Sequence, residues 1–207
     1  GLVALLVGAL CGYIWGALVG LLKAKFEVNE VISSIMMNWI AFYLSNYLLS
    51  FPILRSIESD NSYPIKETAS IKIAGAWKMS ESGRAYLAQH KFLKDILNPP
   101  LNFGIIIAIL AAIVVWYILK KTTLGYELRA VGFNEKAAEY GGIDINKSIV
   151  KSMGIAGILA GLAGAITVLG VSGDIGIMAA QEGYGFDGMA VALIAGNNPL
   201  GTIPAAL

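Results

Sequence analysis

Four side chains in one apolar stretch of the sequence could hold a polar, planar ligand. They are two amides and two aromatic residues, Asn38, Trp39, Tyr43 and Asn46, and their spacing places them on adjoining faces of one helix. Amides donate and accept hydrogen bonds, and aromatic rings offer a face for stacking. The same residue types also join membrane helices to one another or anchor them at the membrane surface. The sequence therefore makes these residues candidates for a ligand pathway and leaves the purely structural role open.

Two acids, Glu182 and Asp187, interrupt the last apolar stretch. Acids at membrane depth are functional candidates because burial of a charge is costly, whereas acids at the outer surface are simply solvated. If a helix begins near Gly188, its amino end, with Asp187 as a cap, would point into a cavity. Both placements of the acids stay open at this point.

A break follows in the same stretch, where Asn197 and Asn198 precede Pro199. A helix from Gly188 to this break would have a length of about half a membrane. Alternatively, residues 175–195 cross the whole membrane and the break is an ordinary turn. In the first case the two asparagines could line a cavity, and in the second they only cap the turn.

Other chemistry finds little support in the sequence. His90 and Cys11 are the single histidine and the single cysteine, so no metal site is expected. The glycines of Gly183–Gly188 match the dinucleotide fingerprint in letters, but no βαβ unit surrounds them, and the sequence has no Gly-Lys-Ser/Thr phosphate loop. We therefore expect this chain to bind no cofactor. A net charge of +1 also argues against nucleic-acid binding.

The elements that must position these residues follow from hydropathy. Of 207 residues 57% are apolar and 14% charged, and the mean hydropathy is +0.68, which indicates a chain embedded in a lipid bilayer. We predict an all-α, polytopic transmembrane helical bundle with at least four full spans and a broken or partial fifth segment. The predicted spans are residues 2–22, 31–54, 101–119 and 152–172, and the fifth segment is residues 175–207. The sequence starts at Gly1 and stops inside an apolar stretch, so we expect one permeation domain, 1–207, that is a piece of a longer protein.

The charges predict the orientation of these spans. Lys23 and Lys25 follow the first span, and a second basic segment, residues 120–151, separates the third span from the fourth. Two spans lie between these segments, so both belong on one side, which the positive-inside rule makes the cytoplasm. Residues 55–100 then form an external loop.

Glycines recur every four residues in the first span, at Gly8, Gly12, Gly16 and Gly20. Small residues at this spacing form a groove in which another helix backbone can approach closely. We expect this span to be packed against other helices. The fourth span has a similar but less regular set of glycines and alanines.

The segment 120–151 predicts a short helix of about two turns. Asn134 is a suitable N-cap, Glu135 suits the positive end of the helix dipole, and Gly141 and the following glycine can end the helix. Ala137 and Ala138 would form a small, nearly flat surface on it. Such a short helix needs support, either from a docked partner or from the membrane face.

Three motifs in this chain resemble the ATP-binding cassette importer permeases of the branched-chain amino acid and sugar class. The first is T-x-x-G-x-x-x-R-A-x-G-x-N-x-x-A-A-x-x-x-G-I from Thr122 to Ile143, followed by a span rich in glycine and alanine. The other two, Asn29–Trp39 and Gly183–Gly201, are similar to the subgroup that imports nucleosides and simple sugars. Together they cover nearly the whole chain apart from the external loop.

The resemblance implies a permease subunit of a bacterial cell membrane that has no enzymatic activity of its own. It would form a homodimer or heterodimer with a second permease, receive nucleosides or simple sugars from an extracellular binding protein, and be driven by cytoplasmic ATP-binding subunits. For a nucleoside, Asn38, Trp39, Tyr43 and Asn46 supply suitable partners, with Asp187, Asn197 and Asn198 as further pathway candidates. The residues that the resemblance implies in ATPase coupling are Gly125, Arg129, Ala130, Gly132, Asn134, Ala137, Ala138, Gly141 and Ile143.

One alternative belongs to a different class. An ion-coupled secondary transporter would use Asp187 and Glu182 to bind the coupling ion. Such a protein has no need of a docking helix between residues 129 and 143, so that segment discriminates the two hypotheses.

Overall fold

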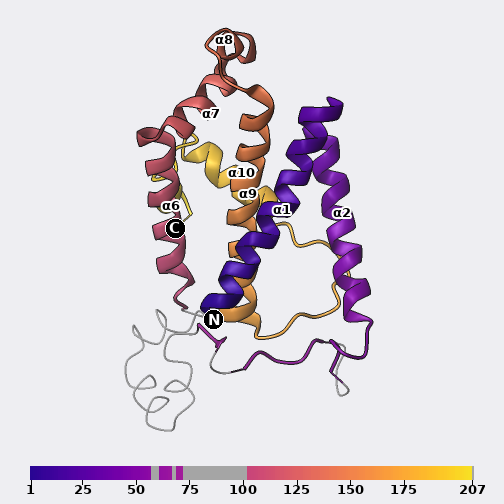
Figure 1. Ribbon diagram of the computed structural model, residues 1–207. Helices are drawn as coiled ribbons and strands as arrows, with labels where there is room; N and C mark the ends of the chain where they lie inside the picture. Colours follow the sequence, from indigo (N-terminus) through magenta and orange to yellow (C-terminus); the bar gives the residue numbers. More distant parts are fainter. Residues whose placement is uncertain (57–60, 67–68, 72–101, 207) are drawn as a thin grey trace, which may run out of the picture.

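The computed structural model describes residues 1–56, 61–66, 69–71 and 102–206, and within these ranges the regular secondary structure is helical. Figure 1 shows long helices side by side, with a smaller helical tip, residues 123–140, at one end. The long helices are α1 (Leu2–Phe26), α2 (Glu30–Leu49), α6 (Gly104–Lys121) and α9 (Ile145–Thr167), the last continued by a π-helical turn, η2 (Val168–Ser172). The shorter ones are α7 (Thr123–Phe133), α8 (Glu135–Tyr140), α10 (Tyr184–Ile194) and α11 (Thr202–Ala205). The predicted all-α, polytopic bundle is confirmed.

Three described helices are long and apolar enough to cross a membrane: α1, α6 and the continuous helix Ile145–Ser172. The helix α2 has a comparable length, 20 residues, but its serines and asparagines make it more polar. At 1.5 Å per residue it is still about 30 Å long, which matches the hydrocarbon thickness. The second predicted span is thus present as a helix with polar side chains.

The glycine repeat of α1 packs directly on α9. A methyl group added at Gly16 would lie 3.0 Å from the Gly157 Cα atom, and one added at Gly20 would lie 2.8 Å from the Val150 Cα atom. At Gly12 the added carbon would collide with the Gly157 carbonyl oxygen. The two backbones therefore touch along the repeat, as small residues permit in membrane helices. The predicted close packing of this span is confirmed, and its partner is the other glycine-rich span.

Helix ends differ from the predicted bounds for local reasons. The second span was expected to continue to residue 54, but α2 ends at Leu49, ahead of Pro52. Proline lacks an N–H and disfavours helical backbone before it, which explains the earlier end. In contrast, α9 begins at Ile145 rather than residue 152, because the Asp144 side chain accepts a hydrogen bond from the Lys147 N–H and starts the helix.

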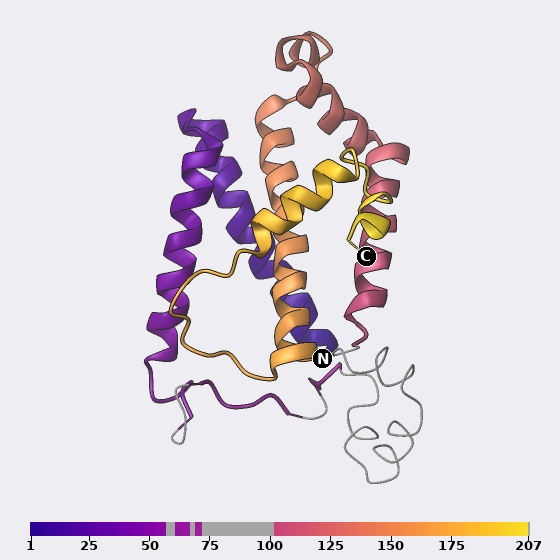
Figure 2. The same cartoon turned by 180° about the vertical axis from the view of Figure 1, so that it is seen from behind.

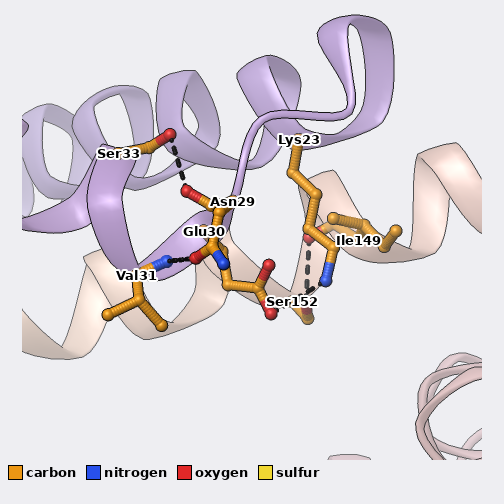
Figure 3. Close-up of polar contacts among 7 residues, drawn as sticks. All are labelled: Lys23, Asn29, Glu30, Val31, Ser33, Ile149 and Ser152. Atoms are coloured by element: carbon orange, nitrogen blue, oxygen red, sulfur yellow. Dashed lines mark hydrogen bonds and ion pairs between the residues drawn. The ribbon is translucent and has the colours of Figure 1, made fainter.

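The α1–α2 turn is closed by polar contacts (Figure 3). The chain leaves α1 through Glu27, which has left-handed backbone (φ 53°). Asn29 then caps α2 by accepting a hydrogen bond from the Val31 N–H at 2.9 Å. Lys23 and Glu30 form an ion pair at 3.0 Å across the turn. This turn lies at the same end of the molecule as α7 and α8 (Figure 1), so the two predicted basic segments share one end.

The stretch after η2 returns toward the middle of the molecule without helical structure (Figure 2). Its first residues pair with the described part of the predicted external loop: the Ser62 N–H donates to the Ile175 carbonyl at 2.8 Å, and the Ile65 N–H donates to the Gly173 carbonyl at 2.9 Å. A helix then forms as α10, with 11 residues. The structure therefore shows a half-length helix, not a full span from 175 to 195.

Candidate functional sites

The helical tip begins with a sharp reversal after α6. The Thr122 hydroxyl donates to the Ile118 carbonyl at 2.6 Å and accepts from the Gly125 N–H at 3.2 Å, which ends α6 and caps α7. Gly125 is buried, and a methyl group there would lie 2.6 Å from the Leu119 Cα atom. The threonine and glycine of the first motif thus fold α7 back onto α6, and Gly125 has no surface to offer a partner.

The predicted short helix is confirmed as α8. The Asn134 side chain accepts a hydrogen bond from the Ala137 N–H at 3.1 Å, and Glu135 stands in the first turn. The helix ends at Tyr140, where Gly141 is the C-cap and Gly142 takes a positive φ of 77°. The Ile143 N–H then donates to the Ala138 carbonyl at 3.0 Å. The motif positions Asn134, Gly141 and Ile143 therefore each have a local structural reason.

The expected flat surface of Ala137 and Ala138 is wrong. Ala137 is exposed, but Ala138 is only 4% exposed and faces the molecule. Adjacent residues of a helix point about 100° apart, so a helix that rests on its neighbours buries one of the pair. Ala138 supports the tip, and Ala137 belongs to its outer surface.

Two aromatic residues at the tip were missed by the sequence reasoning. Phe133 precedes the α8 cap and is 89% exposed, and Tyr140 ends α8 and is 97% exposed. Large rings in water are unfavourable unless a partner covers them. Their position at both borders of a short capped helix in a polar segment was the available signal.

The remaining coupling candidates lie at or near this surface. Arg129 is exposed, and its Nε atom donates to the Gly125 carbonyl at 3.3 Å, so the side chain lies along its own helix. Gly132 is exposed with open space around it, while Ala130 and Ile143 are partly buried. Just beyond, Lys147 donates from its backbone and side chain to Asp144, which lowers the pKa of that carboxyl.

The candidate amides of α2 bind the extended segment that precedes α10. Asn46 donates from Nδ2 to the Met178 carbonyl at 3.0 Å and accepts from the Met178 N–H at 3.1 Å. Asn38 donates from Nδ2 to the Gln181 Oε1 atom at 3.0 Å. Asn46 is thus fully engaged in holding a backbone, which is the structural role that the sequence left open. Asn38 makes a single bond in the described part of the chain.

The candidate aromatic residues of α2 lie on another side of the helix. Trp39 stacks on Tyr43 with ring centroids 5.8 Å apart, and the two are 43% and 63% exposed. Neither lines a cavity of the described structure that contains Asn38. The expected grouping of amide and aromatic side chains on α2 is therefore divided between two surfaces.

Two cavities lie on different faces of α9. The first, about 580 Å³, is bounded by α1, α2 and α9 and includes Asn38 and Trp15. The second, about 430 Å³, is bounded by α6, α9 and the break after α10, and includes Asn197 and Asn198. Asn198 also accepts a hydrogen bond from the Leu200 N–H at 3.2 Å, so it lines a cavity and caps a turn. Asn38 therefore lines a different cavity from Asn197 and Asn198, and Asn46 lines neither of the two.

Two placements were left open for the acids, and the structure does not show the one in which Asp187 caps a helix that points into a cavity. Gly183 is the N-cap of α10, and Asp187 lies inside its first turn, so Asp187 is not the cap. Asp187 and Glu182 are both exposed, and neither lines either of the two cavities above. These positions therefore give little support to an ion-binding site formed by Asp187 and Glu182.

Comparison with known proteins gives a consistent match. The family model described as "Branched-chain amino acid transport system / permease component" matches residues 1–207. The chain is 42% identical over 204 residues to the guanosine ABC transporter permease protein NupP of Bacillus subtilis, covering 98% of this chain and 53% of the relative.

Two relatives come from Lactococcus lactis. The nucleoside ABC transporter permease protein NupB is 36% identical over 204 residues, with 98% of this chain and 52% of the relative covered. The nucleoside ABC transporter permease protein NupC is 26% identical over 204 residues, with 99% of this chain and 59% of the relative covered. The chain thus spans about half the length of these curated relatives. No solved structure gives a significant match.

Proposed function

The chain belongs to the family of branched-chain amino acid transport system permease components, and on this premise we propose that it forms the translocation pathway of an ATP-driven importer of nucleosides. Its long apolar helices and its family make it a multi-pass protein of the bacterial plasma membrane. Two relatives that match 98% of the chain carry guanosine or nucleoside in their names, which supports nucleosides over simple sugars.

The observation that carries the coupling half of the proposal is the shape of the tip. A capped helix, α8, stands at the end of the molecule (Figure 1). Phe133 and Tyr140 at its borders are exposed. These 207 residues contain no phosphate-binding loop, which is consistent with an energy supply from separate subunits. We propose that α8 seats in a cleft of a cytoplasmic ATP-binding subunit, and that closure of this subunit drives alternating access.

We further propose a heterodimer. Lactococcus lactis has two different relatives named as nucleoside permeases, and this chain is more similar to NupB than to NupC. A second permease of the NupC kind is therefore the proposed partner, with an extracellular binding protein delivering substrate. The external loop, 55–100, is a proposed contact for that protein, and most of it lies outside the described residues.

Uptake by the intact complex tests this function. Membrane vesicles with the full-length protein, its partner permease, the ATP-binding subunits and the binding protein should take up radiolabelled guanosine when ATP is supplied. Excess unlabelled nucleoside should compete, and excess glucose should not. Uptake that survives ATP depletion but stops with an ionophore would instead support the ion-coupled alternative, which family membership disfavours.

A further inference from the structure

We propose that the cavity between α1, α2 and α9 holds the base of the transported nucleoside, with Asn38 reading its edge and Trp15 providing the stacking surface. This proposal rests on the proposed function and assigns its binding site within the chain. Trp15 lies on α1, a helix that was not among the pathway candidates expected from the sequence.

The depth of the cavity fits a transport site. Its walls come from the middle of α1 and α9, residues 8–19 and 153–161, and from residues 34–38 in the amino-terminal half of α2. Substrate sites of membrane transporters lie near the middle of the bilayer, where helices can rock around them. A volume of about 580 Å³ leaves room for a nucleoside together with a few waters.

The shape of the cavity suits a flat ring. One wall is formed by the glycines where α1 and α9 touch, including Gly12, Gly16 and Gly157, which present backbone and no side chains. Trp15 supplies the aromatic ring among the residues that line this cavity. A mostly apolar site with a few well-placed polar groups is what small-ligand sites share, and stacking between a base and an aromatic side chain is favourable for every base.

Asn38 is held in a defined orientation with hydrogen-bonding capacity to spare. Gln181 accepts from one N–H of its amide at 3.0 Å, which fixes the plane of the group. In the described part of the chain nothing else binds this amide, so Oδ1 and the second N–H remain available to a ligand. One acceptor beside one donor complements the edge of a purine, which amides recognise in a bidentate manner. Gln181 is thus a positioning residue, and Asn38 is the contact.

The second cavity fits a nucleoside less well. Its lining residues between α6, α9 and α11 include no aromatic side chain, and Asn198 already accepts a hydrogen bond from the Leu200 N–H. A base placed there would find no stacking partner, and the Asn197 amide, which also lines this cavity, is not oriented by a hydrogen bond of the described structure. The comparison between the two cavities therefore provides a control within the same molecule.

Cys11 makes the proposal testable by direct occupancy. It is exposed and lines the proposed cavity. In membranes containing the full complex, a positively charged methanethiosulfonate should modify Cys11 from the aqueous phase, and guanosine should slow this reaction severalfold. The extent of modification is read by mass on the peptide that contains Cys11. No modification would mean that the cavity holds no water, and modification without protection would mean that it holds no nucleoside. Either result overturns the proposal.

The matched control places the thiol in the other cavity. The double variant Cys11→Ser, Ala163→Cys puts the cysteine at an exposed position on the wall between α6 and α9. Guanosine should not protect it. Equal protection at both positions would indicate a general change of conformation and would contradict the assignment.

Transport kinetics provide a second test. Asn38→Ala and Trp15→Leu should each raise the KM for guanosine by about tenfold or more, since each removes one contact of the base. Trp116→Leu, a tryptophan of α6 that does not line this cavity, should leave the KM unchanged. Asn38→Asp keeps an acceptor and loses the donor, so it should change the ranking of guanosine, inosine and adenosine, which a purely structural residue would not do.

The two proposals fail in different ways. Wild-type complex that takes up no nucleoside would refute the proposed function. Guanosine uptake with an unaltered KM in Asn38→Ala and Trp15→Leu would leave the function standing and refute the cavity assignment. Loss of assembly in a variant is recognised from subunit co-purification, and the Cys11 protection assay on wild-type protein then decides.

Discussion

Asn46 and Met178 exchange two hydrogen bonds, side-chain amide to backbone, at 3.0 and 3.1 Å. The Asn46 amide thus pairs with the Met178 backbone as the backbone of a neighbouring β-strand would, by donating to its carbonyl and accepting from its N–H. Met178 belongs to an extended segment without helical hydrogen bonds, and the Asn46 side chain provides partners for its N–H and carbonyl groups. Backbone within a membrane needs such internal partners because no water is available there. Asn46 therefore fixes the approach to α10, whereas Asn38 keeps capacity for a ligand.

Replacement of Asn46 should loosen this segment. In Asn46→Leu the Met178 N–H and carbonyl lose their partners, at a cost of about 1–3 kcal/mol if they stay buried. We expect faster hydrogen exchange at residues 176–183 in the detergent-solubilised complex. Ser45→Ala, at the preceding residue of α2, serves as the control. Equal exchange in both variants would show that the Asn46–Met178 hydrogen bonds are dispensable.

The α1–α9 contact should tolerate no added methyl group. Gly12→Ala would collide with the Gly157 carbonyl, and the overpacking should cost about 1–3 kcal/mol and lower the midpoint of thermal unfolding. Gly164→Ala, on α9 but with open space around the site, should be neutral or slightly stabilising, because alanine favours a helix more than glycine does. A similar midpoint in both variants would argue against backbone contact along the repeat.

Substitutions of the two exposed rings at the tip should weaken docking of the ATP-binding subunit without affecting folding. Phe133→Ala and Tyr140→Ala remove exposed rings, so the protein should remain stable but retain less ATP-binding subunit on co-purification, with weaker coupling of ATP hydrolysis to uptake. Tyr117→Ala, an exposed tyrosine of α6 away from the tip, is the control. Undiminished co-purification of the ATP-binding subunit with both tip variants would exclude the rings from docking.

Ala137 and Ala138 refine the same experiment. Ala137→Arg should block the partner while the tip stays folded, whereas Ala138→Arg would force a charge into the buried side and destabilise α8. Limited proteolysis distinguishes the two, since only the second variant should become more sensitive between residues 123 and 143. Equal sensitivity would contradict the burial of Ala138.

Glu27 provides a test of the α1–α2 turn. Its positive φ of 53° is unfavourable for most residues, and asparagine tolerates it better. Glu27→Asn should therefore raise the unfolding midpoint slightly, and Glu27→Val should lower it by a larger amount because a β-branched residue resists this conformation. The order of the two midpoints, measured in the same detergent, is the result that matters.

Much of the fold was predictable from the distribution of apolar and charged residues. The long helices, the shared end of the two basic segments and the Asn134 cap follow from local rules: hydrophobic length, charge placement and capping chemistry. The bounds of α2 and α9 were less accurate, because Pro52 and Asp144 act over only a few residues. The exposed rings of Phe133 and Tyr140 were overlooked, since their exposure depends on how α8 rests on α7 and α9.

The sequence by itself determined that this chain spans a membrane, that α1 has a glycine face and that a short capped helix lies within its basic segment. Tertiary structure decided which helix meets the glycine face, which of Ala137 and Ala138 is buried, and whether residues 173–183 are helical. These last features depend on partners distant in sequence: Gly157 for Gly12, and Asn46 for Met178. Local patterns record what one segment prefers, but a hydrogen bond or a contact between segments exists only once the chain has brought them together.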